Sequence, residues 1–139
     1  MNSVSMKSGV IGGLVGGVAF GTMMSMMDMM PMIAKMVGMG SAGAGWVIHL
    51  LISAATGALF VVIFGKMVTG YGSGVGYGIL YGVIWWVLGA LILMPSILGM
   101  GVQFANMFEA TPMGSLKGHL VFGILLGLVV AHMSKKDPV

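Results

Sequence analysis

Two histidines occupy matching places in the two halves of this chain, His49 and His119. In each case small residues follow at four and eight positions: Ser53 and Gly57 in one half, Gly123 and Gly127 in the other. Spacing of four places these residues on one helical face. Paired imidazoles are the ligands of bis-histidine haem or two corners of a metal site. The plainer interpretation is that each neutral imidazole hydrogen-bonds an adjacent helix and fixes its packing.

Methionine is the second residue type that can do chemistry here, with 17 in the chain and nine of them between positions 23 and 39. Thioethers are soft ligands that prefer Cu(I). Asp28, Met27 and Met30 therefore join His49 and His119 as candidate ligands, with haem b or copper as the candidate cofactor. Residues 23 to 30 point all round a helix, however, and flexible filling of packing gaps also explains the methionines.

The composition excludes most other chemistry. The chain is 58% hydrophobic and 6% charged, and it has no cysteine, so disulfides, thiolate sites and covalent haem attachment are excluded. No serine has a base and an orienting carboxylate nearby, which argues against an enzyme. Basic and aromatic residues do not interleave, so we expect no nucleic-acid partner. A mean hydropathy of +1.08 predicts an integral membrane protein.

Four apolar stretches are long enough to cross a bilayer as helices. They run over residues 8–30, 45–68, 74–95 and 113–133. The predicted fold class is an all-α transmembrane four-helix bundle forming a single domain over residues 1–139. A proline follows the first stretch and ends the third, and we expect it to close each helix. The connection after the third stretch contains a short amphipathic segment, which predicts an interfacial helix or a re-entrant segment.

The chain resembles a tandem duplication of one helix pair, over residues 9–68 and 74–133. Glycines recur every four residues at the start of each half: Gly9, Gly13 and Gly17, then Gly74, Gly78 and Gly82. Both first helices also end in Met-Pro, at Met30-Pro31 and Met94-Pro95. Glycine faces let helix backbones approach closely in a membrane. We therefore expect these glycines, with Ser53, Gly57, Gly123 and Gly127, to be helix-packing positions related by a two-fold axis along the membrane normal.

The lysines predict the orientation. Four spans put both termini on one side, and that side carries the lysine excess: Lys7, Lys66, Lys135 and Lys136, against Lys35 and Lys117 on the other. By the positive-inside rule the N and C termini are predicted to be cytoplasmic. The predicted location is the bacterial plasma (inner) membrane.

Several short motifs resemble an uncharacterised family of small bacterial four-span membrane proteins. They are the glycine-rich first helix, Gly45-Trp46 followed by His49, the stretch from Tyr81-Gly82 to Met94-Pro95, and Gly118-His119-Leu120. The resemblance implies topology only, because the family has no activity to carry over.

Three functional hypotheses follow from the sequence. The first is a non-enzymatic accessory or structural subunit that packs against a larger membrane complex of the respiratory or electron-transfer type. The second is a haem- or copper-binding membrane protein that uses the two histidines and the neighbouring methionines. The third is a small channel or transporter, which close-packed glycine faces disfavour because they leave little lumen. The expected partners are membrane lipids and either other integral membrane subunits or further copies of the chain.

Overall fold

The computed structural model describes residues 4–134, and all regular structure in that part of the chain is helical. Four helices are long and apolar enough to cross a membrane: Met6–Met26, Ala42–Met67, Tyr71–Ile97 and Ala110–Ser134. This confirms the predicted all-α class and the four apolar helices. Lys135 and Lys136, which contribute to the predicted orientation, lie outside the described residues.

In the first half of the bundle, the first long helix ends in a sharp turn that comes earlier in the chain than predicted. Its elements are α1 (Met6–Met26), α2 (Met30–Lys35), α3 (Ala42–Phe64) and the short 3-10 helix η1 (Gly65–Met67). α1 ends four residues before the expected Met30, because Met27 and Asp28 form a turn in which Asp28 has a φ of 54°. Pro31 then lies in the first turn of α2, where its missing N–H costs nothing.

The second half instead carries a continuous helix through its proline. Its elements are α4 (Tyr71–Trp85), the π-helix η2 (Trp86–Leu93), α5 (Met94–Ile97), the 3-10 helix η3 (Phe104–Asn106) and α6 (Ala110–Ser134). Pro95 has no N–H to give the Leu91 carbonyl one α-helical turn earlier. The following loop folds back, and the Gln103 N–H donates to that carbonyl at 2.8 Å. The helix therefore continues to Ile97 with a widened π segment before the proline.

The loop after α5 differs from the predicted interfacial helix. Within residues 98–109 the only helical element is the single turn η3. Gly99 and Gly101 have φ values of 76° and 74°, a backbone conformation that glycine adopts at little cost. These two glycines let the loop fold back, so that the Gln103 amide meets the Leu91 carbonyl instead of continuing a helix.

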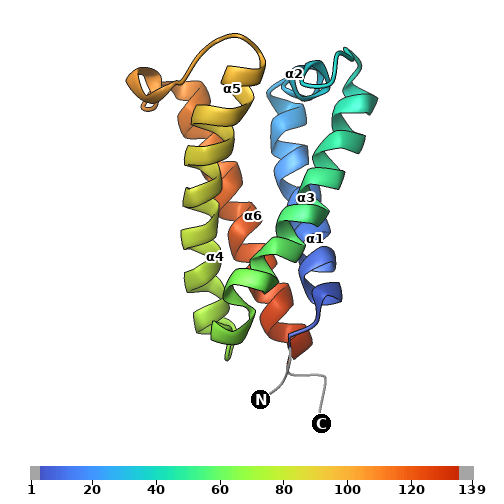
Figure 1. Cartoon of the computed structure of the whole chain (residues 1–139), viewed down its shortest axis with the longest axis vertical. Coiled ribbons are helices and arrows are strands. Elements are labelled where there is room, and N and C mark those ends of the chain that lie inside the picture. Colours follow the sequence, from blue (N-terminus) through green and yellow to red (C-terminus); the bar gives the residue numbers. More distant parts are fainter. Residues whose placement is uncertain (1–3, 135–139) are drawn as a thin grey trace.

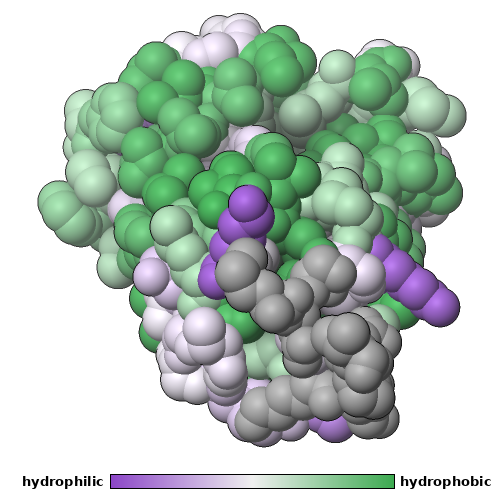
Figure 2. All heavy atoms as spheres, turned by 60° about the horizontal axis from the view of Figure 1, so that its bottom comes forward, coloured by the Kyte–Doolittle hydropathy of each residue, from purple (hydrophilic) through white to green (hydrophobic). Residues whose placement is uncertain are grey.

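The four long helices form two pairs that meet through α1 and α6. α1 packs against α3 and α6, and α6 packs against α1 and α4. Figure 1 shows α2 and α5 together at one end, here called the α2 end, and the start of α1 and the end of α6 together at the other. The face shown in Figure 2 is mostly apolar, with hydrophilic side chains gathered where the described chain begins and ends.

Close glycine contacts hold each pair together. A Cβ built on Gly13 would strike the Ser53 carbonyl, and one on Gly78 would strike the Gly123 carbonyl. Similar contacts join Gly9 to Gly57, Gly17 to the side chain of Ser53, Gly74 to Gly127 and Gly82 to the carbonyl of His119. The helix backbones therefore approach too closely for any side chain at these positions.

An aromatic cluster joins the outer helices α3 and α4 away from the α2 end. It consists of Phe60, Phe64, Tyr77 and Tyr81, whose neighbouring ring centroids lie 5.2 to 6.0 Å apart. The Tyr81 hydroxyl also donates to the Thr56 carbonyl at 2.6 Å. This contact closes the space between α3 and α4 over that half of the bundle.

Candidate functional site

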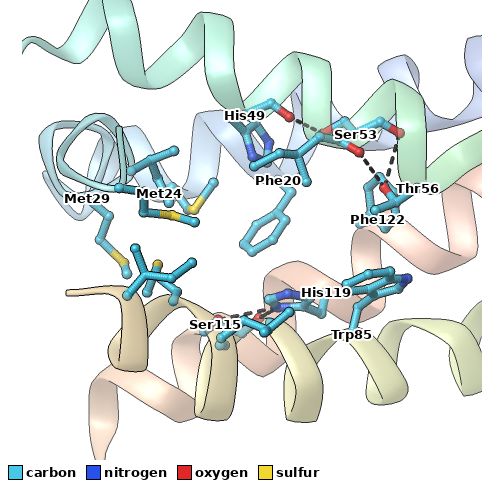
Figure 3. Close-up of a pocket in the computed structure, with 18 residues that line it drawn as sticks. Phe20, Met24, Met29, His49, Ser53, Thr56, Trp85, Ser115, His119 and Phe122 are labelled. Atoms are coloured by element: carbon cyan, nitrogen blue, oxygen red, sulfur yellow. Dashed lines mark hydrogen bonds between the residues drawn. The ribbon is translucent and has the colours of Figure 1, made fainter. Parts of the chain in front are cut away.

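A cavity of about 320 Å³ lies between the two helix pairs on the α2 side of this aromatic cluster. All four long helices contribute to its 18 lining residues (Figure 3), α2 contributes Ile33, and Met29 and Met36 line the cavity from the two ends of α2. Phe20 of α1 and Phe122 of α6 are both buried and form the back wall, where α1 packs against α6. The lining is mostly apolar, and its polar groups are the two imidazoles, a few hydroxyls and the indole N–H of Trp85, which is buried and has no hydrogen-bond partner within residues 4–134.

The cavity opens sideways between α3 and the η2–α5 segment. Three of its lining residues are well exposed, Ile52 on α3 at 42%, Leu93 on η2 at 49% and Ile97 on α5 at 56%. All three are aliphatic and lie on helices long and apolar enough to cross a membrane. The mouth is therefore an apolar opening on the side of the bundle, the face that a bilayer would cover.

Both histidines line this cavity, and their hydrogen bonds fix which ring nitrogen carries the proton. His49 is buried, and its Nε2 lies 2.8 Å from the Gly17 carbonyl of α1. His119 has its Nδ1 2.8 Å from the carbonyl of Ser115, one turn earlier in α6. A carbonyl only accepts, so these nitrogens must be the donors, and the apolar surroundings favour the neutral form of each ring. Within residues 4–134 the other nitrogens, Nδ1 of His49 and Nε2 of His119, have no hydrogen-bond partner and present lone pairs.

The ring of Phe20 lies between the two imidazoles (Figure 3). Its centroid is 5.5 Å from that of His49 and 4.6 Å from that of His119. A metal ion sits about 2.0–2.1 Å from each nitrogen ligand, so two histidines sharing one ion must face each other closely. The Phe20 ring occupies that position. In this arrangement the two histidines share a cavity, and a shared ion would require the Phe20 ring to move.

The methionines in the cavity differ from those that the sequence singled out. Met24, Met29, Met36 and Met94 line it. Met27 is exposed and lies against Gly114, Asp28 is exposed in the turn after α1, and Met30 is buried where its carbonyl packs on Gly45. None of these three lines the cavity. Within the described residues, no group of three or more His, Cys, Asp or Glu is placed to hold a metal ion.

Sequence reasoning missed three features of the site: Phe20, Ser115 and the π segment. Ser115 lies four residues before His119, a helical spacing at which the imidazole can reach its carbonyl, so this partner was detectable. The π segment had an indirect signal in Pro95, which disturbs the turn before it. Phe20 had none, because its position between the histidines depends on how α1 packs against α3 and α6.

No protein-family model matches this chain, and comparison with curated proteins and with solved structures gives no match either. The resemblance to a four-span family stays a prediction, and the functional argument rests on the site alone.

Proposed function

We propose that this chain is a non-enzymatic multi-pass membrane protein that binds a lipophilic small molecule in the cavity between its helix pairs. One observation carries the proposal: both histidines line a single apolar cavity whose mouth opens on the side of the bundle. Small-molecule sites are typically concave and apolar, with a few placed polar groups and volumes of roughly 300–1,000 Å³. A ligand dissolved in the bilayer would reach this cavity without crossing water.

A cavity of this kind is unusual in a bundle whose other contacts are so close. Glycine contacts bring α1 against α3 and α4 against α6, whereas the η2 segment leaves space for a guest beside Gly89 and Ala90. A π segment inside a helix frequently accompanies a functional site. A multi-atom apolar guest would restore the packing contacts that an empty cavity lacks.

The proposal extends to the arrangement of the chain. The glycine contacts occur in the same register in both halves, which supports two tandem helix pairs. The start of α1 and the end of α6 lie at one end (Figure 1), and the lysine excess supports placing that end in the cytoplasm of a bacterial cell. Membership of a larger complex and haem or copper binding stay predictions. Co-purification of large subunits at fixed stoichiometry tests the first.

The test of ligand binding is a comparison of Gly89→Phe with Gly76→Phe. Gly89 lines the cavity, and a Cβ there would meet only Trp85 at 3.8 Å, so the aromatic ring fills the cavity without striking backbone. Gly76 is exposed on α4 and a Cβ there would meet nothing within 4 Å. It is therefore a matched control for adding the same side chain to the same long helix.

Wild type and both variants would be purified gently from membranes, and their co-purifying small molecules extracted and identified by mass spectrometry. We expect one lipophilic compound at near-stoichiometric amount in wild type and in Gly76→Phe, and its loss from Gly89→Phe. Identical extracts from all three proteins would refute the proposal. A visible spectrum and elemental analysis of the same samples test the haem and copper hypothesis, which requires a Soret band or bound copper that His119→Ala removes.

A further inference from the structure

We infer that the ligand of this cavity is a lipid-soluble hydroquinone, bound through a hydroxyl that donates to an imidazole nitrogen. The inference rests on the proposed function and specifies the chemical class of the ligand. Three observations carry it: the protonation of the two histidines, the aromatic and thioether walls, and the apolar mouth.

The histidines select for a hydrogen-bond donor. Each uses its only N–H on a backbone carbonyl, His49 on Gly17 and His119 on Ser115, both at 2.8 Å. The remaining nitrogens accept only. A carbonyl headgroup, such as that of an oxidised quinone, would meet a lone pair there, whereas a hydroxyl would form a hydrogen bond. At these two nitrogens the site therefore accepts the reduced headgroup and not the oxidised one, while the lining also holds the indole N–H of Trp85, which is buried and has no partner within residues 4–134.

The walls select for an aromatic headgroup. The rings of Phe20, Trp85 and Phe122 line the cavity together with the thioethers of Met24 and Met94. Aromatic rings stack on one another or meet edge to face, and thioether sulfur makes favourable contacts with ring edges. A planar phenolic ring gains both kinds of contact, which a purely aliphatic alcohol does not.

The mouth selects for an apolar tail. Ile52, Leu93 and Ile97 are exposed there, on the side of helices long and apolar enough to span a bilayer. A headgroup seated against the histidines can extend an isoprenoid or alkyl chain between α3 and α5 into the hydrocarbon. The three features together describe a hydroquinone with a lipid tail.

The experiment compares three probes on the full chain in micelles: decylubiquinol under anaerobic conditions, decylubiquinone, and the dimethyl ether of the quinol, which keeps the ring but lacks both donors. Equilibrium dialysis gives each Kd. We expect the quinol to bind about tenfold more tightly than its dimethyl ether, the effect of one well-made hydrogen bond to a buried acceptor. We expect the quinol to bind more tightly than decylubiquinone by the same factor.

Two variants assign the effect to the site. His119→Phe keeps a flat ring but removes the acceptor, and since this histidine bonds only its own helix the fold should tolerate the change. In His119→Phe we expect the Kd of the dimethyl ether to exceed that of the quinol by no more than about twofold. His132→Phe is the control, because His132 is exposed near the other end of the same helix and bonds Tyr71, and it should leave the preference intact.

The outcomes separate the two proposals. Equal binding of all three probes, abolished by Gly89→Phe, would overturn the hydroquinone assignment while the lipophilic site stands. A preference for the quinol that survives His119→Phe and the double variant with His49→Phe would also overturn the assignment. Binding of every probe that is unchanged by Gly89→Phe would overturn the proposed site itself.

Discussion

The two helix pairs share one packing scheme and differ where they build the cavity. In both, glycines of the first helix lie against the second: Gly13 on Ser53 in the first pair, Gly78 on Gly123 in the second. At the α2 end they diverge. The first pair breaks before Pro31 and forms α2, while the second continues through Pro95 as a π segment. Close contacts at matching positions thus hold the bundle, and the unlike ends enclose the space between the pairs.

The histidines show the same contrast. His49 bonds across the helix pair to Gly17, whereas His119 bonds within its own helix to Ser115. One imidazole therefore links two helices as well as lining the cavity, and the other only lines it. Equivalent sequence positions do not imply equivalent energetic roles.

The largest expected effect tests what the pairs share. Gly13→Leu and Gly78→Leu should each destabilise the fold by about 3 kcal/mol or more, because the new side chain meets backbone that cannot move aside. Unfolding by SDS followed by circular dichroism measures both. Gly72→Leu, where a Cβ would meet nothing within 4 Å, should cost less than about 0.5 kcal/mol. If Gly78→Leu left stability unchanged while Gly13→Leu lowered it, the two helix pairs would not be equivalent in their packing.

The histidines provide the next test, in which the pairs should differ. His49→Ala removes a hydrogen bond between α3 and α1 and leaves the Gly17 carbonyl without that donor, so we expect a loss of about 1–2 kcal/mol. His119→Ala removes a bond within α6 and should cost about half as much. The same SDS titration compares them, and equal losses would show that the crossing bond contributes nothing extra.

The tryptophans near the α2 end should show a smaller difference. The Trp86 Nε1–H donates to the Pro112 carbonyl at 2.9 Å and so joins η2 to α6, whereas Trp46 packs on Gly21 and makes no hydrogen bond within residues 4–134. Trp86→Phe should therefore destabilise the fold by about 1 kcal/mol more than Trp46→Phe. If Trp46→Phe destabilised the fold more than Trp86→Phe, the packing of Trp46 in the first pair would contribute more than the Trp86 hydrogen bond.

The smallest expected effect concerns the turn that only the first pair contains. Asp28 has a φ of 54°, a conformation that costs a residue with a side chain roughly 1 kcal/mol more than glycine. Asp28→Gly should thus raise stability by up to about 1 kcal/mol. A destabilised variant would mean that the carboxylate makes an interaction with a ligand or partner, as the sequence-based metal hypothesis requires.

Apolar composition, helical spacing and the glycine register were sufficient to predict four helices long and apolar enough to cross a membrane, and several of the glycines at which they pack. The reason is physical: a bilayer permits few structures, and glycines at intervals of four mark a face on which a neighbouring helix can pack closely. A second glycine face of α1, Gly12 and Gly16 against α6, became apparent only in the structure. His49 and His119 were likewise found by position. The tautomers, the ring of Phe20 between the histidines, and the choice of Met24 and Met29 over Met27 and Met30 were decided only by the tertiary structure. They depend on helix rotation and on a break at Asp28, which nonlocal packing sets.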